Sequence, residues 1–141
     1  MKRVLLICSK NSARSQMAEG LVNHDLADRF KAFSAGTDPS SVHPLAIEVM
    51  REIEIDISRH QSKNLDEFAR ERFDYVITLC DQANESCPVF FGGTKRLHMG
   101  FPDPAAAEGT PEEKQVGFRK VRDQIRAQLE EFLKTQNEGK S

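Results

Sequence analysis

The sequence predicts one three-layer α/β domain, in which a four-stranded parallel sheet is flanked by helices. Two observations lead to this prediction. Runs of branched apolar residues, typical of strands buried on both faces, alternate with segments whose apolar residues recur at helical spacing. The length of 141 residues suits a single domain, which at this size can bury a core without disulfides or metal ions. We expect the domain to span residues 1–141, with a frayed tail from about residue 136.

The first half of the chain predicts two strands and two helices. Residues 3–7 are almost entirely apolar and form the central strand of the predicted sheet. A helix follows from about residue 15 to residue 26, with Ser12 or Ser15 available as its N-cap. Residues 31–34 form a short strand. His43-Pro44 then opens a second helix, because proline favours the first helical position.

The middle of the chain gives weaker signals. The alternation of isoleucines over residues 53–57 is ambiguous. Residues 64–71 predict a short third helix, residues 75–79 another buried strand, and residues 95–99 a weaker strand.

The clearest helix start lies near the C-terminus. Thr110 can cap this helix, Pro111 occupies its first position, and Glu113 completes a capping box. One apolar stripe follows, made of Phe118, Val121, Ile125, Leu129 and Phe132.

Composition narrows the classes of function. The chain has 20 Lys and Arg against 22 Asp and Glu, a net charge of −2 that provides no basic field for nucleic acid or an anionic membrane. The first apolar run, residues 4–8, is too short for a signal peptide or a membrane span, so we expect a cytoplasmic protein. Its 3 cysteines are an odd number, which argues against a framework of structural disulfides.

Three chemically capable residues follow predicted strands. Cys8 and Cys80 each come directly after a strand, and Asp103 comes a few residues after another. Ligands of parallel α/β sheets bind beyond the carboxyl ends of the strands. We therefore expect these three side chains at the same edge of the sheet.

The loop after Cys8 has the composition of an oxyanion-binding site. A strand-to-helix loop can turn its N–H groups inward and adds the positive end of the helix. Arg14 can donate two parallel hydrogen bonds to an oxyanion, and the same field favours the thiolate of Cys8. The predicted loop comprises Ser9, Lys10, Asn11, Ser12, Ala13, Arg14 and Ser15.

A second thiol-bearing stretch runs from Cys80 to Cys87. Six small or polar residues separate the two thiols, so the stretch is not a CxxC motif, and His98 is a weak fourth ligand for zinc. A segment with few apolar anchors opens easily, so Cys80 can pair first with one sulfur and then with another.

These motifs resemble a known family. The segment Cys8 to Gly20, CSKNSARSQMAEG, is similar to the phosphate loop and first helix of the low-molecular-weight tyrosine phosphatase superfamily, and more narrowly of its thioredoxin-coupled arsenate reductases. The resemblance covers nearly the whole chain. It continues through Phe33-Ser34-Ala35-Gly36, Ile55-Asp56-Ile57-Ser58, Thr78-Leu79-Cys80-Asp81, Cys87-Pro88 and Phe101-Pro102-Asp103-Pro104.

The resemblance implies a low-molecular-weight tyrosine phosphatase-like fold and the reduction of arsenate to arsenite. Cys8 would be the nucleophile, Arg14 would hold the oxygens and Asp103 would be the general acid. A Cys8–Cys80 disulfide would pass to Cys80–Cys87 and be reduced by thioredoxin. The resemblance implies no bound cofactor or metal, and we expect a monomer.

The chain departs from the family pattern at the loop. Lys10 stands where many members have glycine, and Ala13 replaces a second loop cysteine found in some. Asn11, Glu19 and Ser34 match positions that some relatives use around an alkali cation. Lys63 stands where those relatives have an acid, so we expect its ammonium to replace the cation.

Two alternative functions remain at this stage. A phosphatase would need only Cys8, Arg14 and Asp103, and the alanines at 105–107, in place of aromatic residues, favour a small substrate. A non-enzymatic thiol module would bind arsenite, zinc or a partner protein. We interpret His24, His43, His60 and His98 as structural or solvated, and Phe90-Phe91-Gly92-Gly93 as core packing rather than a docking loop.

Overall fold

The computed structural model describes residues 1–80 and 95–138. Its strands form one 4-stranded parallel sheet in the order β2-β1-β3-β4. Three α-helices lie within these residues, together with short 3-10 turns. The predicted parallel α/β fold is confirmed. The bounds are β1 Lys2–Cys8, α1 Arg14–Asp25, β2 Phe30–Gly36, α2 Pro44–Arg51, η1 Leu65–Phe68, β3 Tyr75–Thr78, β4 Lys95–His98, η2 Pro104–Ala106 and α4 Pro111–Glu138.

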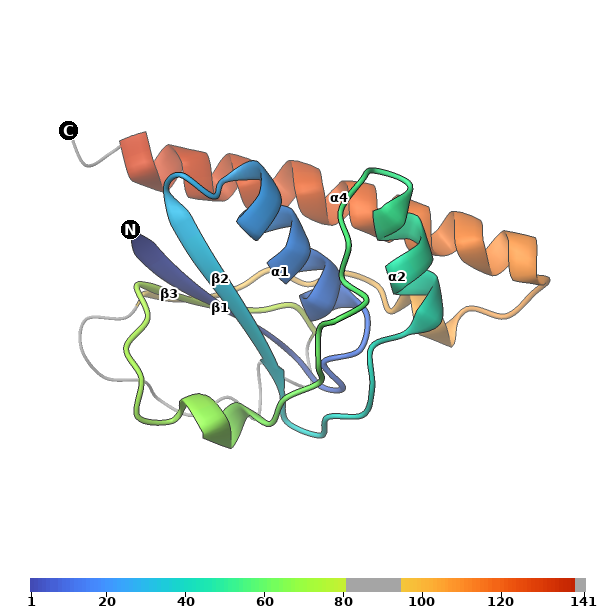
Figure 1. Cartoon of the computed structure of the whole chain (residues 1–141), viewed down its shortest axis with the longest axis horizontal. Helices are drawn as coiled ribbons and strands as arrows, with labels where there is room; N and C mark the ends of the chain where they lie inside the picture. Colours follow the sequence, from blue (N-terminus) through green and yellow to red (C-terminus); the bar gives the residue numbers. More distant parts are fainter. Residues whose placement is uncertain (81–94, 139–141) are drawn as a thin grey trace.

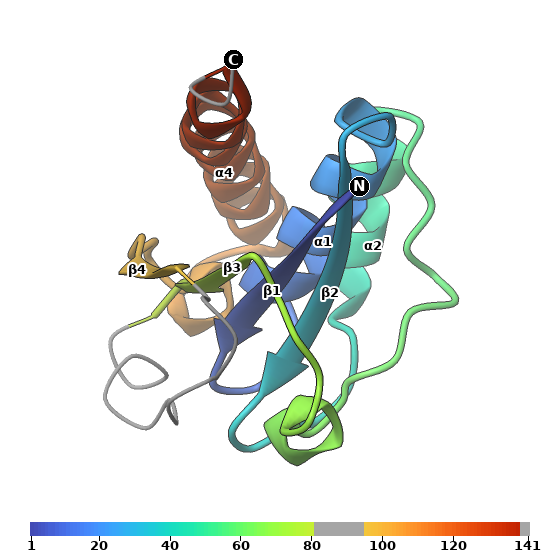
Figure 2. The ribbon, with the colours of Figure 1, turned by 90° about the vertical axis from the view of Figure 1, so that its left-hand side faces the viewer.

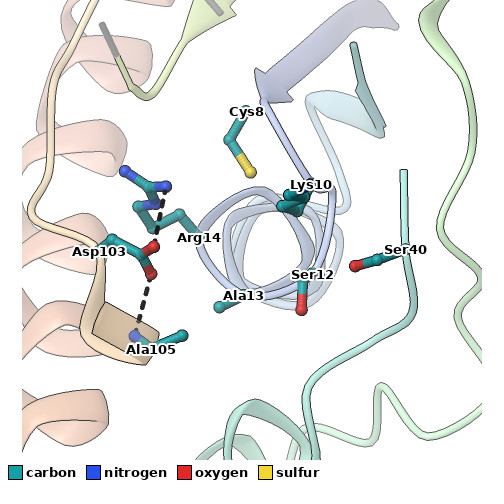
Figure 3. Close-up of a pocket in the computed structure, with 8 residues that line it drawn as sticks. All are labelled: Cys8, Lys10, Ser12, Ala13, Arg14, Ser40, Asp103 and Ala105. Carbon is teal, nitrogen blue, oxygen red and sulfur yellow. Dashed lines mark hydrogen bonds and ion pairs between the residues drawn. The ribbon is translucent and has the colours of Figure 1, made fainter. Parts of the chain in front are cut away.

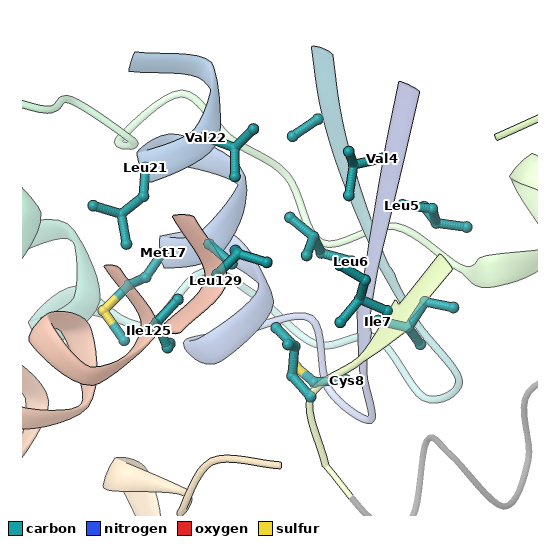
Figure 4. Packing of buried hydrophobic residues seen from close by; sticks show 14 of the residues in the cluster. Val4, Leu5, Leu6, Ile7, Cys8, Met17, Leu21, Val22, Ile125 and Leu129 are labelled. Atoms are coloured by element: carbon teal, nitrogen blue, oxygen red, sulfur yellow. The ribbon is translucent and has the colours of Figure 1, made fainter. Parts of the chain in front are cut away.

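Strand β1 is the centre of the sheet because its residues are apolar on both faces. It pairs with β2 on one side and β3 on the other, and Val4 to Ile7 are fully buried. Figure 4 shows Leu6 on the side of β1 that faces Met17 and Leu21 of α1 and Leu129 of α4, and Leu5 on the opposite side. This core fixes the position of Cys8, the last residue of β1.

The two faces of the sheet have different covers. Phe30 and Phe33 are three residues apart in β2 and so point to opposite faces. Phe30 contacts Tyr75, whose ring packs on Phe132 of α4, whereas Phe33 contacts Phe68 of η1. Figures 1 and 2 show α1, α2 and α4 gathered together, with η1 lying apart from them across the sheet. These layers agree with the three-layer prediction.

The short helix predicted over residues 64–71 is present but ends earlier than expected. The segment forms a single 3-10 turn, Leu65–Phe68, closed by a capping box between Asn64 and Glu67. Leu65 and Phe68 are buried, and one turn is enough to bury both. The ambiguous isoleucine alternation forms turns and irregular chain, with Ile57 fully buried against α1 at Gly20.

The two predicted helix starts have opposite outcomes. At α4, the N–H of Glu113 donates to Thr110 Oγ1 over 3.1 Å and Glu113 Oε1 accepts from the N–H of Thr110 over 3.0 Å, which confirms the capping box. At α1, the N-cap is Ala13 and no side chain caps the helix, so the prediction of Ser12 or Ser15 was wrong. The hydroxyl of Ser15 is engaged elsewhere.

The last helix is longer than expected. Helix α4 continues to Glu138, into the stretch predicted to fray. Within residues 1–80 and 95–138, no helix is at once long enough and apolar enough to cross a membrane.

Candidate active site

The carboxyl ends of β1 and β3 bring Cys8 and Cys80 to the same edge of the sheet. Ile7 and Thr78 are paired in register, and the N–H of Leu79 donates to Ile7 O over 2.7 Å, so Cys8 at the end of β1 and Cys80 just after β3 belong to adjacent strands. A cavity of about 170 Å³ opens at this edge (Figure 3). Its lining consists of Cys8, Lys10, Ser12, Ala13, Arg14, Ser40, Asp103 and Ala105.

The loop after Cys8 turns its carbonyl groups outward into the scaffold. Three of them accept hydrogen bonds from backbone N–H groups of the segment that follows β2. Because a trans peptide places C=O and N–H on opposite sides, the N–H groups of Lys10, Asn11 and Ala13 face away from this segment, and such N–H groups form an anion nest. The bonds are Asp38 N to Ser9 O (2.8 Å), Ser40 N to Lys10 O (3.1 Å) and His43 N to Ser12 O (3.0 Å).

The side chain of Asn11 stabilises the conformation of the loop through hydrogen bonds. Its backbone has a φ of 49°, in the left-handed region that asparagine tolerates better than most residues. Its Oδ1 accepts from the backbone N–H of Lys63 over 2.8 Å and from Gln16 Nε2 over 3.0 Å. The backbone N–H of Lys63 can only donate, so the amide orientation of Asn11 is fixed and its Nδ2 donates to Ser15 Oγ over 2.7 Å.

This chain of hydrogen bonds ends at the sulfur of Cys8. Ser15 Oγ lies 3.1 Å from Cys8 Sγ. Because Ser15 already accepts from Asn11, its own hydroxyl proton is free to point at the sulfur. Cys8 is 2% exposed and α1, which follows the loop, has no side-chain cap. The hydroxyl of Ser15 and the N-terminus of α1 therefore both lie at the end of the loop that carries Cys8 Sγ.

Gly36 allows the loop to lie against β2. A Cβ atom at this position would be 2.6 Å from Ser9 O and 3.0 Å from both Asn11 N and Cys8 O. All three are backbone atoms and cannot rotate away. Only glycine fits the loop and the strand together in this arrangement.

Arg14 and Asp103 form one wall of the cavity. Arg14 is 9% exposed, and its Nη1 donates to Phe101 O over 3.1 Å, which anchors the guanidinium. Its Nη2 lies 3.8 Å from Asp103 Oδ2. Asp103 Oδ1 accepts from the N–H of Ala105 over 2.9 Å, so the carboxyl group is held at the cavity mouth. The wall thus offers hydrogen-bond donors and a carboxyl group to one bound anion.

Cys80 lines a second cavity next to the first. This cavity, of about 400 Å³, is bounded by Arg14, Cys80, Gly100, Phe101 and Pro102, so Arg14 belongs to both cavities. Cys8 and Cys80 are both buried. Cys87 and the phenylalanines at 90 and 91 lie outside the described residues.

A family model decides where this arrangement belongs. The model described as "Low molecular weight phosphotyrosine protein phosphatase" matches residues 3–141. The chain belongs to the low molecular weight phosphotyrosine protein phosphatase family. Over 134 residues it is 43% identical to a protein of Halalkalibacterium halodurans named "Arsenate reductase", covering 95% of this chain and 96% of that one.

Solved structures of the family superpose well on this chain. One described as "An arsenate reductase in the intermediate state" has a TM-score of 0.78 at 32% identity, covering 96% of this chain and 98% of that one. The thioredoxin-dependent arsenate reductase of Corynebacterium glutamicum has a TM-score of 0.72 at 27% identity. This chain is covered to 96% in that comparison and spans 63% of that longer chain.

Lys63 places a further cationic side chain near the loop. Its ammonium lies 3.9 Å from Glu19 Oε1, which also accepts from Ser34 Oγ over 2.5 Å. A positive charge therefore stands beside Glu19 under the loop, where the sequence led us to expect the lysine ammonium.

The four histidines contact other residues of the fold. His43 Nδ1 accepts from the N–H of Leu45 over 3.1 Å and caps α2, and burial lowers the pKa of His43. His60 Nδ1 lies 3.0 Å from Gln16 Oε1, His24 pairs with Asp25, and His98 bonds Thr78.

Sequence reasoning missed several residues that shape the loop. Gly36, Gln16 and Ser40 contact the loop from other segments, and the backbone N–H of Lys63 orients Asn11. Only Gly36 carried a usable signal, because it comes two residues after a predicted strand, at the edge where Cys8 stands.

Proposed function

We propose that this protein reduces arsenate to arsenite with electrons from thioredoxin. The observation that carries the proposal is a buried Cys8 thiol in a cavity of about 170 Å³ beside Arg14, with Cys80 at the end of the adjacent strand. The identity of 43% with a named arsenate reductase and the similarity to a thioredoxin-dependent one support the assignment.

In the first step, the Cys8 thiolate attacks the arsenic of arsenate. The loop N–H groups and Arg14 hold the oxygens, and Asp103 protonates the departing oxygen, which leaves as water. One As–O bond breaks and one S–As bond forms. Arsenic remains As(V), bound to Cys8.

The second and third steps transfer two electrons. Cys80 attacks Cys8 Sγ, the S–As bond breaks with its electron pair on arsenic, and arsenite leaves as As(III) while a Cys8–Cys80 disulfide forms. Cys87 then attacks Cys80 and releases the Cys8 thiolate, so the disulfide becomes Cys80–Cys87. The thioredoxin dithiol reduces this disulfide and is itself oxidised.

Three further expectations accompany this chemistry. We infer that the enzyme needs no resident cofactor, because protein thiols and thioredoxin carry both electrons. We infer a cytoplasmic location, because the relay begins with reduced cysteines. We also expect a monomer with one domain over residues 1–141 that binds neither nucleic acid nor membrane.

The test is arsenate-dependent oxidation of NADPH in the presence of thioredoxin and thioredoxin reductase. Wild type should turn over, and Cys8→Ser, Cys80→Ser and Cys87→Ser should each reduce turnover to background. Lys120→Met, on the exposed side of α4, is a control that should retain full activity. Unchanged turnover in Cys87→Ser would contradict the relay.

A phosphatase activity is the second candidate, because Cys8, Arg14 and Asp103 share one cavity. It would use the same thiolate attack on phosphorus and would not need Cys80. An aryl phosphate assay separates the two functions. If Cys80→Ser hydrolyses the ester at the wild-type rate while wild type fails to reduce arsenate, the phosphatase is the correct function.

A further inference from the structure

Lys10 gives the cavity a second positive side chain. In Figure 3, Arg14 and Asp103 stand on one side of the loop, and Lys10 and Ser40 on the other. Arg14 is buried and its guanidinium is anchored by Phe101 O, so the group has little freedom to move. Lys10 is different, because its flexible stem carries a charge that can change partners.

The ammonium of Lys10 has a partner outside the cavity. It forms an ion pair with the carboxylate of Asp38. The backbone builds this pairing, since Asp38 N donates to Ser9 O over 2.8 Å and Ser40 N donates to Lys10 O over 3.1 Å. Asp38 therefore stays beside Lys10 whatever the side chains do.

This ion pair is easily exchanged. The side chains of Lys10 and Asp38 are 58% and 72% exposed, and exposed ion pairs contribute little to stability. An anion with two negative charges, bound between Arg14 and the loop, attracts the ammonium more strongly than the single charge of Asp38 does. The same attraction is weaker for an anion with one charge.

We propose that Lys10 is an exchangeable second cation of the oxyanion site, whose ammonium leaves Asp38 for a bound tetrahedral oxyanion and favours doubly charged anions over singly charged ones. This inference rests on the proposed function, because it assumes that the cavity binds an oxyanion. Asp38 then competes with the bound anion for the ammonium of Lys10. The Lys10–Asp38 ion pair must break before Lys10 contacts the anion, so this pair weakens anion binding.

Titration of the reduced protein with inorganic phosphate tests the proposal without turnover. The amide NMR signals of the loop report the dissociation constant for wild type, Lys10→Met, Asp38→Asn and the double variant. Lys10→Met should weaken phosphate binding about three- to tenfold, and Asp38→Asn should tighten it about two- to fivefold. Lys120→Met, an exposed lysine of α4, controls for net charge and should leave the dissociation constant unchanged.

The double variant and the pH dependence decide the mechanism. If Asp38 acts by holding Lys10, Asp38→Asn should have little effect once Lys10 is methionine. The effect of Lys10→Met should be larger at about pH 8 than at about pH 5.5, because phosphate gains its second charge between these values.

The outcomes are separable. Equal phosphate affinities in wild type and Lys10→Met would refute the proposed role of Lys10. An effect of Asp38→Asn that is just as large in the double variant would refute it too. Neither result would contradict the oxyanion site itself. Loop amides of the wild type that do not respond to phosphate at all would refute the oxyanion site, and with it the proposed function.

Discussion

Gly36→Ala is the sharpest single perturbation of the loop. The added Cβ would lie 2.6 Å from Ser9 O, and ordinary contact begins at 3.4 Å, so the loop and β2 must separate by about 0.8 Å. Both sides of the contact are backbone, which leaves no side chain to rotate. Overpacking of this kind destabilises a protein by about 1–3 kcal/mol.

The same displacement should reduce activity. A shift approaching 1 Å moves the loop N–H groups away from the developing charge, and errors of this size can lower rates by roughly 10–100-fold. We expect Gly36→Ala to unfold at a lower urea concentration and to show this loss in kcat/KM for arsenate at temperatures where it remains folded.

Gly117→Ala provides the matched control. Nothing lies within 4 Å of the Cβ that it would add to α4. Alanine is the better helix residue, so this variant should gain about 0.5–1 kcal/mol and keep its activity. Gly36→Ala with wild-type stability and wild-type kcat/KM would refute the close-packing explanation.

Three further predictions concern charge and hydrogen bonding. Burial, with the nearby Asp25 carboxylate adding to it, raises the pKa of Glu130 from 4.5 to about 8. Glu130 is thus protonated in the folded state while the unfolded chain is ionised, so wild-type stability should fall from about pH 4.5 to about pH 8. Glu130→Gln should remove this fall, about 5 kcal/mol, in urea unfolding at both ends of the range. Arg14→Lys should lower kcat/KM about 100-fold, since lysine cannot donate in the bidentate geometry. Ser15→Ala should lower kcat/KM for arsenate about tenfold, because it removes the hydroxyl beside Cys8 Sγ. An unchanged kcat/KM would exclude a role for this hydroxyl in the reaction.

Local signals in the sequence were enough to predict the frame of the protein. The branched apolar run before Cys8 predicted the buried central strand, and the strand ends placed Cys8 and Cys80 at one edge. Thr110 and Pro111 predicted the start of α4, because a capping box is completed within four residues. Elements that are determined by residues close together in the sequence could therefore be predicted.

Features that depend on distant residues were not predictable. The orientation of Asn11 depends on the backbone of Lys63, 52 positions away. The missing side-chain cap of α1 has a local cause, because Ser15 bonds Asn11 and Cys8, four and seven residues before it, instead of the helix N–H groups. The helix predicted over residues 64–71 is shorter than expected because tertiary packing needs only one buried turn there.

The outward carbonyl groups of the loop have a consequence for how such a site can evolve. Main-chain atoms of residues 38–43 hold three carbonyl groups of the loop, and these bonds do not depend on the side chains at Lys10 or Ala13. Substitutions at positions such as Lys10 and Ala13 can therefore accumulate singly without collapse of the anion nest. A backbone template of this kind allows natural variation, or a protein engineer, to retune charge and selectivity at the cavity mouth while the reactive sulfur stays in place.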